Sequence, residues 1–213
     1  MTRSALETRE RILEAAEEVF AAKGLRGARV DEIAARAQAN KRMLYHYFQS
    51  KEDLYAAVLK SNFEKVLAAT GRSSGERSDP AKELEEAIKA YFHFLKENPR
   101  FARLMTWETL EGGVYARKVL PPIWEQGFPR LRAILEEGRS RGVFRPDLDV
   151  RQVLTSIHTL CLSCFTQKDI LAILWRDDPA RPENLEKRLE HILDMIMRTI
   201  LVQGPGEAAR STP

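Results

Sequence analysis

Apolar residues recur at intervals of three and four along most of the chain, which is the spacing of amphipathic helices. No run of alternating β-branched residues interrupts this pattern, so the sequence predicts an all-α fold. The pattern predicts about nine helices, at residues 6–23, 30–37, 41–48, 51–69, 81–97, 98–110, 121–141, 149 to beyond 164, and 183–202.

Local signals delimit several of these helices. Asn40 and Asp149 are suited to cap helix N-termini, and Ser50 with Asp53 three residues later forms a similar start signal. Pro99 fits the first position of a helix, and Gly24 follows the first apolar pattern as a stop.

The predicted order of elements divides the chain into four parts. We expect a three-helix domain at 1–50, a connecting helix and linker at 51–79, a helical bundle at 80–203 and a disordered tail at 204–213. The linker prediction rests on the Gly-, Ser- and charge-rich stretch 70–80.

The second and third predicted helices are short and are joined by the three residues 38–40. This is the geometry of a helix-turn-helix, in which the second helix enters the major groove of DNA. Leu44 and Phe48 lie four residues apart and can pack inward against Ile33 and Val19. The remaining side chains of residues 41–47 are then left on the surface.

Charge supports this interpretation only locally. The 213 residues include 34 Lys and Arg against 31 Asp and Glu, a net charge of +3. From Lys23 to Lys51, however, seven basic residues face two acidic ones, a local balance of +5. A solvated helical face is the alternative explanation, but cations and aromatic rings together on an exposed helix favour phosphate and base contacts. The predicted DNA-contacting residues are Arg29, Asn40, Lys41, Arg42, Met43, Tyr45, His46, Tyr47 and Lys51.

The sequence from about residue 8 to residue 60 resembles the N-terminal domain of TetR-type transcriptional regulators. The matching pieces are Phe20, Gly24, Ile33, Ala34, Leu44, Tyr45, Tyr47, Phe48 and the run Ser50 to Leu54. The sequence departs from the family at four places: Ala28 and Arg29 replace a common Thr or Ser, the usual Gly-Val-Ser turn is Gln38-Ala39-Asn40, and Arg42 and Met43 replace smaller residues.

The resemblance implies a homodimer whose two subunits bind a palindromic DNA operator, with release of the repressor by a small-molecule effector. Apolar stripes on the last two predicted helices could pair across a two-fold axis as a four-helix interface. An ordinary core within one chain is the alternative for the same stripes. The predicted interface residues are Val153, Ile157, Leu189, Ile192, Leu193, Ile196 and Ile200.

Aromatic residues of the middle helices are candidate walls of an effector pocket, although most such residues are expected to be core. Because few charged side chains accompany them, the expected effector is small and apolar or aromatic. The candidate lining residues are Tyr91, Phe94, Trp107, Trp124, Phe128, His158, Cys161 and Phe165.

Other functions have weaker support in the sequence. His158, Cys161 and Cys164 share one helical stripe, which suggests a metal or redox site, but a fourth ligand is absent and apolar neighbours favour packing. No third group orients a Cys–His pair for catalysis, so neither an enzyme nor a cofactor is predicted. No apolar run is long enough to span a membrane, and we expect a cytoplasmic protein. A ligand-independent or activating regulator and a helical-bundle enzyme remain the alternatives.

Overall fold

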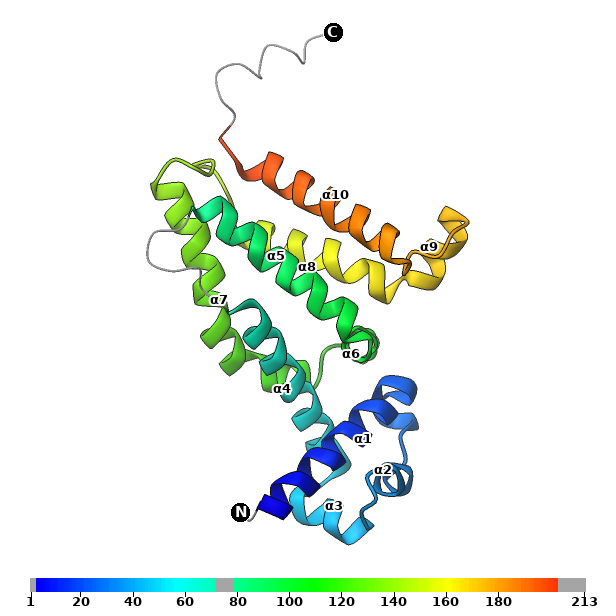
Figure 1. Ribbon diagram of the computed structural model, residues 1–213. Coiled ribbons are helices and arrows are strands. Elements are labelled where there is room, and N and C mark those ends of the chain that lie inside the picture. The colour runs from blue at the N-terminus through cyan, green and yellow to red at the C-terminus, as the bar shows by residue number, and fades with distance from the viewer. Residues whose placement is uncertain (1–2, 72–78, 203–213) are drawn as a thin grey trace. The chain divides into compact units, whose positions relative to one another are not determined.

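The computed structural model describes residues 3–71 and 79–202, except for the side chains of residues 3–4 and 124–129. The described residues form ten helical elements and a single isolated β-bridge, between Phe144 and Leu201, so the all-α prediction is confirmed for this part of the chain (Figure 1). The elements are α1 (Arg3–Gly27), α2 (Val30–Arg36), α3 (Lys41–Tyr47), α4 (Lys51–Thr70), α5 (Pro80–Glu97), α6 (Pro99–Leu110), α7 (Ala116–Ser140), α8 (Val150–Thr166), α9 (Lys168–Trp175) and α10 (Pro182–Ile200).

The helices pack into two compact units that interleave along the sequence. The first unit comprises residues 1–67 and 98–126, and the second comprises 68–97 and 127–213. The sequence predicted that residues 98–126 belong to the C-terminal bundle. In the structure these residues, which form α6 and the start of α7, pack in the first unit with the helix-turn-helix. The predicted tail, 204–213, and most of the predicted linker, 72–78, lie outside the described residues.

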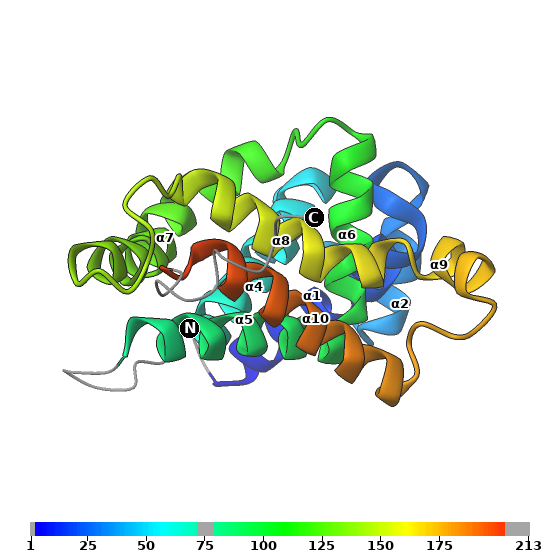
Figure 2. The ribbon, with the colours of Figure 1, turned by 90° about the horizontal axis from the view of Figure 1, so that it is seen from above.

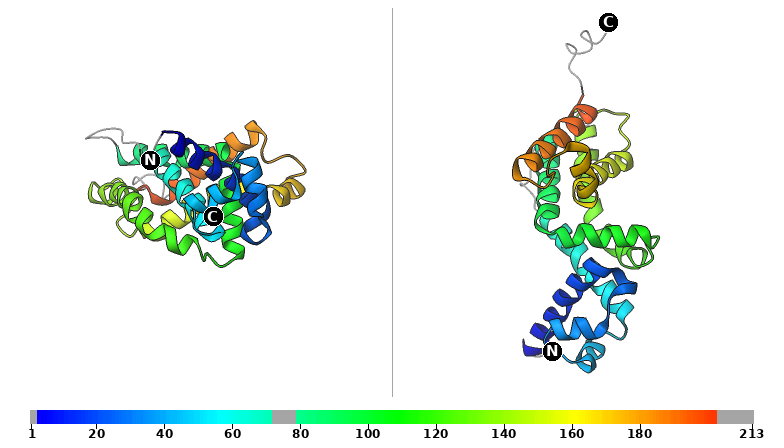
Figure 3. Two further views of the ribbon diagram at one scale, coloured as in Figure 1. Left: turned by 90° about the horizontal axis from the view of Figure 1, so that it is seen from below. Right: turned by 90° about the vertical axis from the view of Figure 1, so that its right-hand side faces the viewer.

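The first unit is built around α1, which packs against α2, α3 and α6. Its core includes the predicted inward residues Val19, Ile33, Leu44 and Phe48, all buried. Phe20 meets Tyr55 of α4 edge to face, with ring centroids 5.0 Å apart. The blue to cyan helices in Figure 3 show this cluster of short helices from two sides.

Gly24 interrupts α1 where the sequence predicted a stop. Its backbone angles, φ 66° and ψ 177°, are not helical, and a short helical segment follows as far as Gly27. The predicted N-terminal caps of α3, α4 and α8 are confirmed. Asn40 accepts a hydrogen bond from the Met43 backbone N–H at 2.8 Å, and Asp53 donates its backbone N–H to Ser50 Oγ at 3.0 Å. Asp149 likewise caps α8.

The second unit has a three-helix core of α5, α8 and α10, which lie side by side in Figures 1 and 2. This core includes most of the residues predicted for the dimer interface. Six of the seven predicted residues are buried within a single chain, and Leu193 is half-buried. The stripe on α10 is covered by α5 and α8 of the same chain. Within one chain these residues are core, and their place in a dimer interface stays a prediction.

The helix α9 was not predicted from the sequence. The apolar pattern instead predicted one long helix that continues past Cys164. In the structure α8 ends at Thr166, Gln167 forms its C-cap, and α9 follows with a bend of 78°. Within the described residues, no single helix has both the length and the apolar character needed to cross a membrane. The α8–α9 pair has enough apolar residues only when the two bent helices are taken together.

Candidate DNA interface

The turn before α3 fixes how that helix is presented. Gln38 adopts the left-handed conformation, with φ 51°, and Ala39 then donates its backbone N–H to the carbonyl of Ala34 at 2.9 Å. The Asn40 cap starts α3 immediately afterwards. Because Leu44 and Phe48 are buried in the core, the opposite face of α3 is held outward.

The outward face of α3 carries most of the predicted DNA-contacting residues. Lys41, Arg42 and His46 are exposed, and Met43 and Tyr45 expose 36% and 43% of their surface, which is unusual for such large apolar or aromatic side chains. Tyr47 is half-buried and its ring meets that of His46 edge to face, 5.3 Å between centroids. The structure therefore brings a cation, a thioether and aromatic rings together on one exposed helix.

Several cations of the +5 region are already paired with carboxylates. Lys41 Nζ lies 3.0 Å from Asp31 Oδ1, and its hydrogen bond to Asp31 raises the pKa of Lys41 above its usual range. Lys23 Nζ lies 2.6 Å from Glu32 Oε2, and this hydrogen bond is the main reason that the pKa of Glu32 is lowered.

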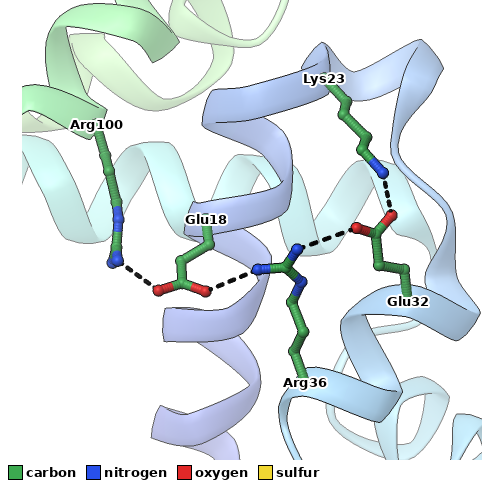
Figure 4. Close-up of polar contacts among 5 residues, drawn as sticks. All are labelled: Glu18, Lys23, Glu32, Arg36 and Arg100. Atoms are coloured by element: carbon green, nitrogen blue, oxygen red, sulfur yellow. Dashed lines mark hydrogen bonds and ion pairs between the residues drawn. The ribbon is translucent and has the colours of Figure 1, made fainter.

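These pairs continue into a network that joins three helices of the first unit (Figure 4). Arg36 of α2 contacts Glu32 at 3.3 Å and Glu18 of α1 at 3.2 Å, and Glu18 also pairs with Arg100 of α6. Sequence analysis missed this network because Arg100 lies 82 residues from Glu18. The network ties α2, which precedes the recognition turn, to both α1 and α6.

Two cations of the region have no such partner among the described residues. The side chains of Arg29 and Arg42 are exposed and make neither an ion pair nor a hydrogen bond there. Lys51 differs, because its Nζ donates to the backbone carbonyl of Ala28 at 3.2 Å and so supports the segment before α2. Asn40 also has a structural role as the cap of α3.

Trp107 belongs to the first unit and packs on α1. Its indole Nε1–H donates to the Ala21 carbonyl at 3.2 Å, and its ring lies directly over Gly24. Trp107 thus has a packing role on α1, and its predicted role as an effector-pocket wall stays a prediction. Nearby, the buried Glu108 accepts from the backbone N–H groups of Tyr115 and Ala116 at 3.1 and 2.7 Å, which satisfies the start of α7.

The second unit brings part of the predicted effector pocket together. The Tyr91 hydroxyl lies 2.9 Å from His158 Nδ1, and their rings stack with centroids 6.0 Å apart. Although His158 is exposed at the surface of the fold, neighbouring atoms shield its ring from water and so lower its pKa. Burial of the Tyr91 hydroxyl raises the pKa of Tyr91. Phe165 meets Phe92 edge to face at 5.3 Å. Phe94 is buried in α5, and the side chains of Trp124 and Phe128 lie outside the described residues.

Cys161 and Cys164 are buried free thiols of α8. Burial raises the pKa of Cys161 to about 12, so its reactive thiolate is disfavoured near neutral pH. Among the residues that the structure describes, no three His, Cys, Asp or Glu side chains are arranged to hold a metal ion. Packing is thus the role that the geometry supports for both cysteines.

Comparison with known proteins assigns the helix-turn-helix region and the C-terminal helices to one family. Residues 12–58 match the family described as bacterial regulatory proteins, tetR family, and residues 80–196 match the tetracyclin repressor-like, C-terminal domain. The chain is also 30% identical over 193 residues to the HTH-type transcriptional repressor NicS of Pseudomonas putida, covering 90% of this chain and 91% of NicS. The chain belongs to the TetR family. It is a DNA-binding transcriptional regulator rather than an enzyme.

Another relative and two solved structures also match this chain. The HTH-type transcriptional repressor SCO4008 of Streptomyces coelicolor is 34% identical over 138 residues, covering 64% of this chain and 67% of that protein. The crystal structure of the transcriptional regulator SCO4942 from the same organism superposes with a TM-score of 0.70 at 30% identity, covering 91% of this chain and 98% of that one. FadR from Bacillus subtilis, solved with stearoyl-CoA, shares the fold at 22% identity and a TM-score of 0.71, with 90% and 98% coverage.

The departure from the TetR-family turn has a structural consequence. Gln38 stands where the family usually has Gly, and it occupies the left-handed region that favours glycine. The turn therefore keeps its geometry at the expense of backbone strain. The second departure, Arg42, places an unpaired guanidinium on the surface of α3 where the family commonly has a small residue.

Proposed function

We propose that this chain is a homodimeric repressor that binds a palindromic operator through α3 and is released by a small-molecule effector bound in the second unit. The observation that carries the DNA-binding part is the outward face of α3, fixed by the Asn40 cap and by buried Leu44 and Phe48. Repression is supported by the 30% identity to a relative named as a repressor.

Within this proposal Arg42 reads bases. It lies in the first turn of the recognition helix, which is the part nearest the base edges in helix-turn-helix complexes. Its guanidinium is unpaired and can bond both acceptors of guanine, a contact that gives about 1 to 3 kcal/mol of discrimination. Lys41 also lies in this turn, but it must leave Asp31 to contact DNA. That exchange has little energetic effect because exposed ion pairs contribute only about 0 to 1 kcal/mol.

Selection of binding sites from a random DNA pool tests this assignment. We expect the wild type to select a palindrome, and Arg42→Ala to lose preference at one symmetric pair of positions. Arg42→Lys is the matched variant, because it keeps the charge but not the fork that bonds guanine. Preference should be lost in both variants, with affinity better retained in Arg42→Lys. Identical preferences in all three proteins would exclude Arg42 from base recognition.

Lys51 is proposed as a phosphate contact in addition to its bond with Ala28. If it contacts phosphate, Lys51→Ala should weaken specific and non-specific DNA about equally and reduce the slope of log K against log salt by about one. Loss of folding stability with an unchanged slope would assign Lys51 to the intramolecular role alone.

The effector is proposed to be a small apolar or aromatic molecule bound near Tyr91, His158, Cys161 and Phe165. Supporting observations are the stacked Tyr91–His158 pair and the aromatic Phe92–Phe165 contact beside it. A ligand that prefers the DNA-free arrangement must both stabilise the protein and lower operator affinity. Thermal-shift screening of apolar and aromatic compounds, followed by operator titration with each hit, tests both effects. A stabilising hit that leaves operator affinity unchanged in wild-type protein would not be the effector.

Activation of transcription is the second candidate. The HTH-type transcriptional activator FasR of Mycolicibacterium smegmatis is 35% identical over 99 residues, covering 46% of this chain and 45% of FasR. A reporter gene under the selected operator distinguishes the two functions. Expression that falls when the chain is supplied supports repression, and expression that rises supports activation.

A further inference from the structure

Two carboxylates lie among the cations of the DNA-binding region, and the structure gives them different partners. Glu32 contacts Lys23 and Arg36 within the network of Figure 4. Asp31 stands outside that network and pairs with Lys41, whose Nζ lies 3.0 Å from Oδ1 and 3.3 Å from Oδ2. Among the described residues, Lys41 is the only cation that forms an ion pair with Asp31.

The Asp31–Lys41 pair joins the start of α2 to the start of α3. Asp31 is the second residue of α2, and Lys41 is the first residue of α3. The pair is open to solvent, because the Asp31 side chain is 77% exposed and the Lys41 side chain 52%. The carboxylate lies within one lysine side chain of the turn that approaches base edges in helix-turn-helix complexes. Asp31 is therefore placed where a bound operator would meet it.

An exposed carboxylate at this position restricts the DNA that can bind well. The proposed function moves Lys41 from Asp31 onto DNA, which leaves the carboxylate without its cation beside a polyanion. The phosphate and deoxyribose oxygens of a duplex accept hydrogen bonds but donate none. In the major groove the donors are the amino groups of cytosine, at N4, and of adenine, at N6. Only particular bases can therefore offer the freed carboxylate a hydrogen bond.

We propose that Asp31 is a specificity-determining residue, which accepts a hydrogen bond from cytosine N4 in the major groove once Lys41 has turned to DNA. The inference rests on the proposed operator contact of α3. Cytosine is favoured over adenine because the acceptor N7 of adenine lies beside its amino group and repels a carboxylate. Guanine and thymine present acceptors at the corresponding edge. Base recognition would then extend from α3 to the first turn of α2.

Charge alone gives Asp31 the opposite role. As one of two acidic residues between Lys23 and Lys51, it lowers the positive charge that attracts phosphates. If Asp31 acted only in this way, its removal would strengthen binding to every DNA by the same factor. A residue that reads cytosine behaves differently, because its removal strengthens non-specific binding and takes away a contact to the operator. The ratio of specific to non-specific affinity distinguishes the two roles.

Selection of binding sites from a random DNA pool provides the first test. We expect the wild type to prefer cytosine at one symmetric pair of positions, and Asp31→Ala to lose that preference. Asp31→Asn should prefer adenine there instead, because an amide can bond adenine N6 and N7 together. Neither a partly unfolded protein nor a changed net charge would produce this switch from one base to another.

Glu32→Gln is the matched control. It removes the same charge from the next residue of the same helix, but the partners of Glu32 are Lys23 and Arg36 rather than a residue of α3. We expect this variant to select the wild-type site at every position. Asp31 is exposed, so its variants should fold, and circular dichroism checks this for all the proteins.

Titration of defined duplexes provides the second test. Replacing the selected cytosine of one half-site by thymine should weaken wild-type binding about tenfold, as for a typical mismatched position. The same replacement should change the affinity of Asp31→Ala by less than about twofold, because that variant lacks the acceptor. On unrelated DNA, Asp31→Ala and Glu32→Gln should both bind more tightly than the wild type, since each lacks one negative charge.

The outcomes separate this inference from the proposed function. If the wild type and both Asp31 variants select the same palindrome with the same bases, Asp31 does not read DNA, and the regulator proposal stands. If Asp31→Ala binds the operator and unrelated DNA more tightly by one common factor, Asp31 acts through its charge and the inference is wrong. Wild-type protein that selects no DNA site would overturn the proposed function and this inference with it.

Discussion

Replacing Gly24 with Ala tests the packing of Trp107 of α6 against α1. Gly24 has φ 66° and ψ 177°, a combination that is essentially confined to glycine. An added Cβ would also lie 2.8 Å from both Cδ2 and Cε3 of Trp107, closer than packed carbon atoms allow. The Trp107 ring cannot move away freely because its indole N–H bonds the Ala21 carbonyl.

The expected loss of stability follows from these terms. A residue held in a strained backbone region costs about 1 to 3 kcal/mol. Overpacking against the indole adds roughly 1 to 3 kcal/mol if Trp107 stays, and a lost hydrogen bond about 0.5 to 1.5 kcal/mol if it shifts. Reduced freedom of the unfolded chain returns about 0.4 to 1 kcal/mol. Gly24→Ala should therefore lower the free energy of unfolding by about 2 to 4 kcal/mol.

Urea unfolding followed by circular dichroism measures this difference. Gly27→Ala is the matched control, because Gly27 ends the same helix without a positive φ and its added Cβ would approach only Lys23 Cβ, at 3.3 Å. The control should be neutral or stabilising by up to about 1 kcal/mol. Adding Trp107→Ala to Gly24→Ala should destabilise by less than the sum of the two single changes, because the clash is gone. Equal stability of Gly24→Ala and Gly27→Ala would refute the argument.

Three further predictions concern single sites. Asn40→Ala removes the cap of α3 and should lower the unfolding free energy by about 1 kcal/mol in urea titrations, whereas Asn40→Asp keeps the acceptor; equal losses would rule out capping. Gln38→Gly should raise the unfolding free energy by about 0.5 kcal/mol, because relief of left-handed backbone strain exceeds the entropy cost of a more flexible unfolded chain. A lower unfolding free energy for this variant would contradict the prediction. The pKa of Cys161 is raised to about 12, so folded protein binds more protons than unfolded protein above about 9. Stability should therefore fall as pH rises over this interval, and Cys161→Ala should reduce the dependence; an equally steep profile would assign it to other groups.

Local signals in the sequence predicted much of the fold. The caps at Asn40, Ser50 and Asp149 act between residues two or three apart, so neighbouring residues contain the necessary information. The bend at Gln167 carries neither Gly nor Pro, and α9 continues the apolar composition of α8. A periodic pattern alone therefore joined α8 and α9 into one helix.

Long-range partners could not be predicted in the same way. Periodicity identified Ile192 and Ile196 as a buried face, but it could not distinguish cover by the same chain from cover by a second copy. Trp107 was grouped with other aromatic residues because composition does not show that its ring lies over Gly24. In both cases the missing information was the identity of the neighbour.

The charge of the DNA-binding region shows how pairing changes the meaning of a sequence count. Electrostatic attraction at a distance depends on all charges around this region, paired or not, and residues 23–51 contribute a balance of +5 to it. Direct contacts do depend on pairing, since Lys23, Arg36 and Lys41 already face carboxylates. Because these exposed pairs are weak, they orient side chains more than they stabilise the fold. Under the proposed function, the paired cations would turn to phosphates with little loss of free energy, while the unpaired side chain of Arg42 would make the base contact that requires defined geometry.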